Sequence, residues 1–169
     1  MTVIRIHEVV VLPLGVEATY DFLTSPPAYE TFTGYGPVPA IDRLEWHEGD
    51  SRTAGSRATV HSKDGSTHTE RVVLADRPTL YAIEISEFSS AFRFLTKGAS
   101  ERWGMMPAPG GTKLERTFEF ELRSPLLWPV GAALGSMFRK AVRKNHENFL
   151  LYLAEHAAEV RTATESASP

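Results

Sequence analysis

The segment that decides the fold spans residues 128–160 and reads WPVGAALGSMFRKAVRKNHENFLLYLAEHAAEV. Apolar side chains recur in it at steps of three and four, and charged side chains fill the opposite side. The two sets are Leu134, Phe138, Val142, Phe149 and Leu153, against Arg139, Lys140, Arg143, Lys144 and Glu147. This spacing predicts one amphipathic helix roughly 45 Å long, enough to cross a small sheet. Such a helix laid along a curved antiparallel sheet encloses a cavity.

Length and composition indicate a single globular domain. The chain has 169 residues, 42% of them hydrophobic, and single domains cluster at ~100–200 residues. We expect this domain to span residues 1–160 and the small, polar residues 161–169 to form a disordered tail. The net charge of -3 offers no basic surface for nucleic acid or an anionic membrane. Nucleic acid is therefore not an expected partner.

The chain contains no cysteine, which excludes disulfides, thiolate nucleophiles and cysteine zinc sites. The apolar run from Val9 to Leu14 is too short for the core of a signal peptide, so we expect a cytoplasmic location. A second apolar run, from Leu126 to Phe138, is too short to span a bilayer, which takes ~20 residues. It predicts a buried helix start or a mobile lid, without stable membrane insertion.

The segments before the long helix predict an antiparallel sheet. Residues 1–12 are extended in character, residues 16–23 have helical spacing, and a further helical turn is expected at 29–32. Six more strands are expected at 41–47, 57–63, 66–74, 81–87, 99–106 and 112–123. The predicted fold class is therefore α+β: a curved seven-stranded antiparallel sheet wrapped around a long C-terminal helix, with two short helices between strands one and two.

The turns predict how the middle strands pair. Asp64-Gly65 is typical of a two-residue type I′ hairpin turn. The expected pairs are His61 with His68, Thr59 with Glu70 and Arg57 with Val72, and the next turn adds Leu74 with Tyr81, Val72 with Ile83 and Glu70 with Ile85. Side chains alternate between the faces of a sheet. These residues are therefore expected on its inner face.

The last strand alternates cleanly and carries one charge on its apolar side. Leu114, Phe118, Phe120 and Leu122 point one way, and Arg116 interrupts that row. Arg116 is thus expected to reach the same inner face. The facing of the strand at residues 99–106 stays open by one residue, so either Trp103 and Met105 or their neighbours line the cavity.

Several short motifs, taken with the order of elements, resemble those of a known superfamily. They are Gly34-Tyr35-Gly36-Pro37-Val38-Pro39, Gly55-Ser56-Arg57, Asp64-Gly65-Ser66, Glu70-Arg71-Val72, Pro78 with Tyr81, Trp103, and Gly110-Gly111-Thr112. Over about residues 9–155 the chain resembles the SRPBCC (START/Bet v 1-like) superfamily, specifically its bacterial polyketide cyclase/dehydrase branch. The resemblance implies a helix-grip fold whose cavity takes lipids, steroids, plant hormones or polyketides. In the cyclases of that branch, pocket Arg and Tyr or Trp side chains carry the activity.

The expected ligand-binding residues follow from the inner face and the long helix. They are Arg57, Thr59, His61, His68, Glu70, Tyr81, Ile83, Ile85, Trp103, Arg116, Phe118, Phe120, Phe138 and Asn145. If the protein is an enzyme, Glu70 is the candidate acid/base, and Arg57 or Arg116 would stabilise a developing oxyanion. Alternatively, Glu70 and Arg57 form an internal ion pair that only satisfies both charges. Asn145 is either a ligand contact or a satisfied core amide.

Metal and cofactor sites are not expected. His61 and His68 would face each other near a hairpin tip, where Glu70 or Glu87 could complete a metal site. However, the sequence has no histidine spacing typical of zinc enzymes, and no nucleotide-binding glycine motif.

Three functions fit these patterns. The first is binding or carrying a small hydrophobic molecule, by a monomer or homodimer. The second is a polyketide cyclase or dehydratase that uses acid/base catalysis in the same cavity. The third is a structural partner protein whose cavity is filled by side chains, which predicts a cavity below ~300 Å³.

Overall fold

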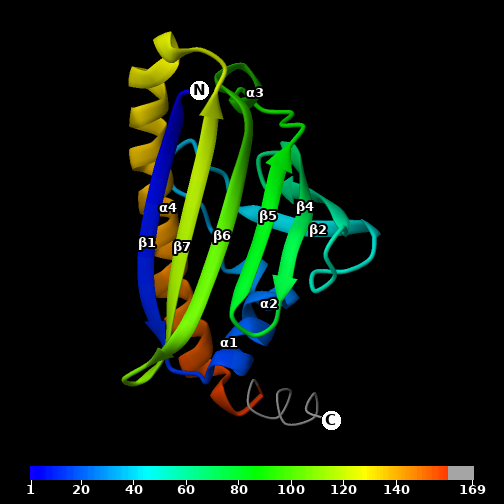
Figure 1. Cartoon of the computed structure of the whole chain (residues 1–169), viewed down its shortest axis with the longest axis vertical. Coiled ribbons are helices and arrows are strands. Elements are labelled where there is room, and N and C mark those ends of the chain that lie inside the picture. The colour runs from blue at the N-terminus through cyan, green and yellow to red at the C-terminus, as the bar shows by residue number, and fades with distance from the viewer. Residues whose placement is uncertain (160–169) are drawn as a thin grey trace.

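A computed structural model describes residues 1–159 and has the predicted helix-grip architecture (Figure 1). The elements are β1 (Val3–Leu12), α1 (Val16–Leu23), α2 (Pro26–Glu30), β2 (Ile41–Glu48), β3 (Arg57–Ser62), β4 (Thr67–Asp76), β5 (Leu80–Ser86), α3 (Phe92–Leu95), β6 (Thr96–Ala108), β7 (Gly111–Leu122), the 3₁₀ turn η1 (Pro125–Leu127) and α4 (Trp128–Glu155). They form a seven-stranded sheet in the order β1-β7-β6-β5-β4-β3-β2. All neighbouring strands are antiparallel.

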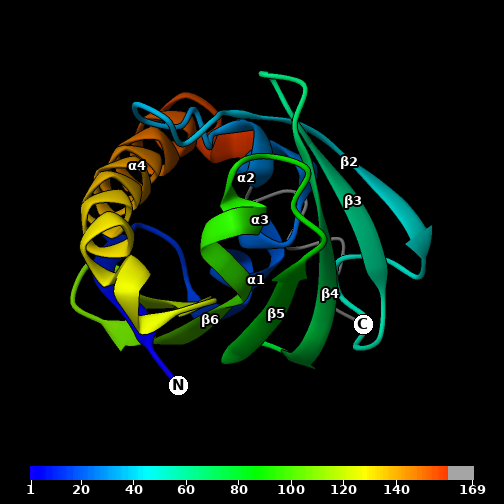
Figure 2. The same cartoon turned by 90° about the horizontal axis from the view of Figure 1, so that it is seen from above.

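The sheet curves around α4, and α1 and α2 close part of the remaining gap (Figure 2). The buried side of α4 includes Val142, Phe149 and Leu153, as its spacing predicts. The helix ends at Glu155 rather than near residue 160. The predicted tail at residues 161–169 lies outside the described residues. Within residues 1–159, no helix combines the length and apolarity that crossing a membrane requires.

The predicted register between β3 and β4 is wrong by one residue. Ala58 lies opposite Glu70, and Thr59 lies opposite Thr69. The cause is the hairpin loop, in which Ser62 N–H donates to the Ser66 carbonyl and Gly65 has a φ of +83°. This is a three-residue loop closed by a left-handed glycine rather than a two-residue turn. A shift by one residue moves every side chain of a strand to the other face.

The β4–β5 register is as predicted near one end and shifts near the other. Val72 lies opposite Ile83, but an irregularity between Val72 and Leu74 then places Ala75, not Leu74, opposite Tyr81. On the next strand, Trp103 lies opposite Tyr81. This pairing resolves the facing of β6, because Trp103 and Met105 are both buried on the inner side.

Candidate functional site

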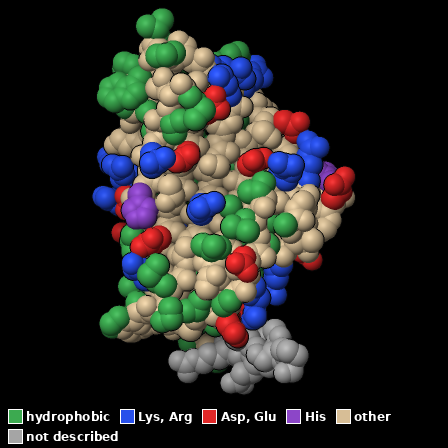
Figure 3. Space-filling model, viewed as in Figure 1, with side chains coloured by type: hydrophobic (Ala, Val, Ile, Leu, Met, Phe, Trp, Pro, Cys, Tyr) green, Lys and Arg blue, Asp and Glu red, His purple; other side chains and the backbone are tan. Residues whose placement is uncertain are grey.

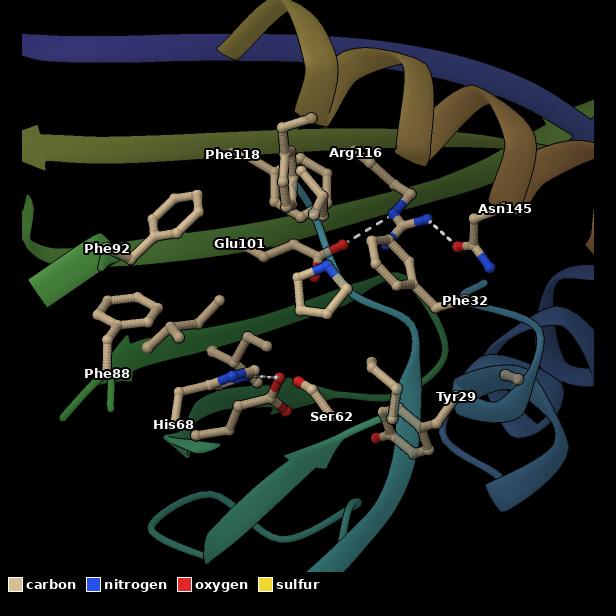
Figure 4. A pocket seen from close by; sticks show the side chains of 18 of the residues that line it. Tyr29, Phe32, Ser62, His68, Phe88, Phe92, Glu101, Arg116, Phe118 and Asn145 are labelled. Atoms are coloured by element: carbon tan, nitrogen blue, oxygen red, sulfur yellow. Dashed lines mark hydrogen bonds and ion pairs between the residues drawn. The ribbon is translucent and has the colours of Figure 1, made fainter. Parts of the chain in front are cut away.

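A cavity of about 140 Å³ lies between the inner face of the sheet and α4 (Figure 4). Its walls come from α2, the segment 32–41, strands β3 to β7, the segment 88–92 and α4. Most of its lining is aromatic or aliphatic, including Phe32, Phe88, Phe92, Phe118, Phe120, Phe138 and Phe149. The site is therefore an apolar chamber with a few polar groups.

The first polar group is a buried cluster centred on Arg116 of β7. Arg116 Nε donates to Glu101 Oε1 at 2.7 Å, and Arg116 Nη1 donates to Asn145 Oδ1 at 2.6 Å (Figure 4). Trp103 Nε1–H donates to the same oxygen of Glu101. The guanidinium also lies over the Phe118 ring, 5.1 Å from its centroid. Both charged side chains are less than one-tenth exposed, so the ion pair is removed from bulk water.

Burial raises the pKa of Glu101, because the charged carboxylate loses its hydration, and the positive charge of Arg116 opposes this shift. The hydrogen bonds from Arg116 and Trp103 both go to Oε1. The second oxygen, Oε2, accepts neither of them, although Glu101 lines the cavity. One carboxyl oxygen of Glu101 is thus free of these two bonds, and it can accept a hydrogen bond or, when protonated, donate one.

A second polar pair lies across the cavity on β4. His68 Nε2 is 3.3 Å from Glu70 Oε1, and the two side chains are 19% and 10% exposed. They share a face because residues two apart on a strand point the same way. The ring of His68 also packs beside Phe88, with 5.8 Å between ring centroids. This pair sets a carboxylate and an imidazole against the apolar wall.

Two tyrosines provide hydroxyl groups to the same chamber. Tyr29 and Tyr81 both line the cavity. Burial raises the pKa of Tyr29 and of Tyr81, and the negative charge of Glu70 adds to both shifts. Both phenols therefore stay neutral at physiological pH. Tyr81 also stacks on Trp103, with 4.6 Å between ring centroids.

The helix α4 supplies two adjacent polar side chains behind the chamber. Asn145 is satisfied on both sides, since it accepts from Arg116 and its Nδ2 donates to Thr31 Oγ1 at 2.9 Å. His146 is buried, and its Nε2 has no hydrogen-bond partner among the described residues. Burial, aided by the charge of Arg116, lowers the pKa of His146 from 6.5 to about 3. His146 is therefore a neutral imidazole under physiological conditions.

The comparisons with known proteins agree with this architecture. Residues 3–157 match the model of a family described as polyketide cyclase / dehydrase and lipid transport. The chain belongs to this family. Its fold is that of the SRPBCC, or START/Bet v 1-like, superfamily, as the sequence motifs indicated. No curated protein matches the chain. Family membership establishes a hydrophobic ligand-binding fold, without naming a ligand.

Solved structures share the family fold at low identity. Ara h 8.0201 has a TM-score of 0.68 at 19% identity, covering 91% of this chain and 99% of that chain. Norcoclaurine synthase from Thalictrum flavum, in complex with dopamine and hydroxybenzaldehyde, has a TM-score of 0.66 at 13% identity, covering 92% and 88%. A protein from Rhodobacter sphaeroides has a TM-score of 0.61 at 17% identity, covering 89% and 93%. At these identities the likeness concerns the fold alone.

Within this family fold, most of the predicted site residues line one cavity. They are His68, Glu70, Tyr81, Ile83, Ile85, Trp103, Arg116, Phe118, Phe120, Phe138 and Asn145. Their positions were predicted correctly because the inner-face residues of β4, β5 and β7 are the ones that the sequence alternation indicated.

The expectation that Arg57, Thr59 and His61 face the cavity is wrong. The one-residue shift in the β3–β4 register places all three on the outer face of the sheet. There, Arg57 binds Glu87 at 2.7 Å, Thr59 contacts His47, and His61 lies 3.1 Å from Glu45. The suggested ion pair between Arg57 and Glu70 does not form, and neither does the suggested opposition of His61 and His68.

Sequence reasoning missed the buried carboxyl group of Glu101 and three aromatic residues of the cavity lining. Glu101 lies two residues before Trp103 on β6, so alternation would have placed it inside once the facing of Trp103 was known. Tyr29, Phe32 and Phe88 lie on a short helix and on loops, where no period of two or 3.6 sets the direction of a side chain. The aromatic content of these segments was the only signal.

Proposed function

We propose that this protein binds a compact, largely apolar molecule of about one aromatic ring in the cavity beneath α4. The observation that carries the proposal is the apolar cavity of about 140 Å³ with polar groups on two walls. An apolar cavity of roughly 150 Å³ is known to hold a benzene-sized guest. A steroid or an extended polyketide would need the walls to move apart.

The polar groups suggest how such a ligand is oriented. Arg116 is held in place by Glu101 and Asn145, and Glu70 lies on the facing wall beside His68. A hydroxyl or carbonyl on the ring would therefore find donors and acceptors while the ring packs on phenylalanines. The fold tolerates ligands of this size, since the norcoclaurine synthase structure holds dopamine and hydroxybenzaldehyde, which are one-ring molecules.

The proposal is tested with a compact probe and a cavity-blocking variant. We expect fluorobenzene to bind the protein saturably, and fluorine NMR measures that binding. Replacing Ile85, which lines the cavity, with tryptophan should weaken that binding at least about tenfold, because the indole fills the ligand's volume. The matched control is Val73→Trp, since Val73 is 39% exposed and does not line the cavity.

Two results would contradict the proposal. One is the absence of saturable fluorobenzene binding to the folded protein, and the other is equal binding by Ile85→Trp and the wild type. Either result would favour a structural partner protein whose cavity is filled by side chains. A cavity volume below ~300 Å³ makes that function the main alternative. Native mass spectrometry of the protein purified from its own host would identify a co-purifying ligand directly.

Acid/base catalysis is a second candidate function. It is favoured by two carboxyl side chains, Glu70 and Glu101, on one cavity, where burial raises the pKa of Glu101. For a ligand that co-purifies, Glu70→Gln separates the two functions. A carrier should lose only a few-fold in affinity, whereas an enzyme should lose turnover by about 10²–10⁴-fold while binding is retained. If Glu70→Gln weakens binding but leaves turnover of the bound ligand unchanged, Glu70 has no catalytic role.

A further inference from the structure

One end of the molecule carries a group of exposed apolar side chains, which we call the apolar tip and define as Phe94, Leu126, Trp128 and Val130. Their exposed fractions are 67%, 90%, 55% and 54%. They lie on α3, on η1 and on the start of α4. Arg123, which precedes η1, is bound to α3, since its backbone N–H donates to the Leu95 carbonyl and its Nε to the Arg93 carbonyl. Figure 3 shows hydrophobic side chains gathered over this end of α4.

The tip is exposed because glycines take the buried positions at the start of α4. A Cβ on Gly131 would lie 3.0 Å from the Leu122 side chain, and one on Gly135 would lie 2.8 Å from Ile4. The helix therefore approaches the sheet closely along its glycine face. The large side chains Trp128 and Val130 lie off that face and remain in water. The predicted buried helix start is wrong for these residues.

The charges nearest the tip are mainly positive, because Arg123 lies beside it and Lys97 forms an ion pair there with Glu121. Further cations, Arg139, Lys140, Arg143 and Lys144, follow about three to four turns along α4, and no Asp or Glu lies between Trp128 and Glu147. Arg139 and Arg143 pair with Glu8 of β1. Arg93 adds a further cation beside the tip, with its guanidinium over the Phe94 ring. This end is thus basic although the whole chain has a net charge of -3.

We propose that the apolar tip docks on the surface of an anionic lipid bilayer. Leucine, tryptophan and valine flanked by arginine and lysine are the composition of segments that insert shallowly at the headgroup boundary. Anionic lipids complement the charge, and the apolar side chains leave water on docking. A second copy of this chain complements it less well, because two basic ends would face each other.

Docking at this end would bring a bilayer beside the ligand cavity. The same two helices that carry the tip also supply Phe92 of α3 and Phe138 of α4 to the cavity lining. A smaller apolar pocket that includes Phe92, Leu134 and Phe138 continues from the chamber toward Gly131. An apolar ligand dissolved in the membrane would therefore meet the protein next to its binding site. The docking itself does not depend on the ligand.

Vesicle co-sedimentation of the full chain tests the proposal. We expect the protein to bind vesicles of phosphatidylglycerol and phosphatidylcholine at low salt, and to bind pure phosphatidylcholine at least about tenfold more weakly. The double variant Leu126→Ser/Trp128→Ser should bind the anionic vesicles at least about tenfold more weakly than the wild type. The matched control is Leu151→Ser, because Leu151 is also 63% exposed but lies at the other end of α4.

A spectroscopic readout locates the contact. The emission of Trp128 should shift to the blue on adding anionic vesicles, and Trp128→Phe should retain binding without that shift. The proposal is overturned if the wild type does not sediment with anionic vesicles, or if Leu151→Ser loses as much binding as the double variant. It is also overturned if light scattering shows a dimer that only the double variant dissolves, since the tip would then be a contact between copies.

Discussion

Replacing Arg116 with methionine is expected to lower the free energy of unfolding by about 3–5 kcal/mol at pH 8. The substitution leaves the carboxylate of Glu101 buried without its cation, because the side chain is only 8% exposed. Trp103 alone would then bind it. Methionine keeps much of the volume and apolar stem of arginine, so the loss reflects charge rather than a cavity. Urea unfolding followed by circular dichroism measures it.

The loss should depend on pH in a definite direction. Burial already raises the pKa of Glu101 above its usual 4.5, and Arg116 opposes that shift. Without Arg116 the folded-state pKa rises further. A group with a raised folded-state pKa contributes stability that is present below its unfolded pKa and is lost as the pH rises through the folded value. The penalty of Arg116→Met should therefore be smaller at pH 5 than at pH 8, by about 1–2 kcal/mol.

The double variant Arg116→Met/Glu101→Gln is the control for this interpretation. It removes both charges and keeps an acceptor for Trp103, so it should recover at least about half of the lost stability at pH 8. Its difference from the wild type should also vary less with pH than that of the single variant. If the double variant is less stable than Arg116→Met at both pH values, the buried charge is not the cause of the loss.

Replacing Gly34 with alanine is expected to lower the free energy of unfolding by about 2–4 kcal/mol and to weaken fluorobenzene binding. Gly34 has a φ of +70°, and a Cβ there would lie 2.2 Å from the Val38 carbonyl oxygen and 2.7 Å from the Pro39 carbonyl carbon. These are backbone atoms and cannot rotate away. The turn they form is closed by two hydrogen bonds between Tyr35 and Val38, and Val38 and Pro39 line the cavity.

Gly65→Ala separates the two causes of that loss. Gly65 has a similar φ of +83°, but a Cβ there meets nothing within 4 Å. Its replacement should therefore cost only the left-handed backbone penalty, about 1–2 kcal/mol, and should leave fluorobenzene binding unchanged. Equal losses for the two variants would mean that the backbone contact at Gly34 does not hold Val38 and Pro39 of the cavity lining in place.

The parts of the site that the sequence predicted correctly are those governed by a strict period. Phe118 and Phe120 alternate on β7, so Arg116 had to share their face, and its charge among apolar neighbours marked it as a site residue. Phe138 and Asn145 followed from helical spacing on α4. Tyr81, Ile83 and Ile85 were placed correctly because one strand repeats every second residue.

The failures lie where a local choice of the backbone decides the outcome. Asp64-Gly65 is compatible with a two-residue or a three-residue loop, and the pairing of Ser62 with Ser66 selects the longer one. That choice turned Arg57 and His61 outward, although their residue types suited the cavity. The partner of Arg116 was unpredictable for a related reason, since the facing of β6 depends on the irregular segment that precedes it.

Asn145 links the buried Arg116 of the cavity wall to Thr31, the residue that follows α2. One amide accepts from Arg116 of the sheet and donates to Thr31 at the end of α2, and Asn148 binds the Thr31 carbonyl one turn later. A ligand that draws the Arg116 guanidinium toward itself takes that bond away from Asn145. Asn145 then keeps only its bond to Thr31, while Asn148 still binds Thr31 and Thr33. A guest that engages Arg116 therefore changes the hydrogen bonding of an amide that also binds the segment after α2.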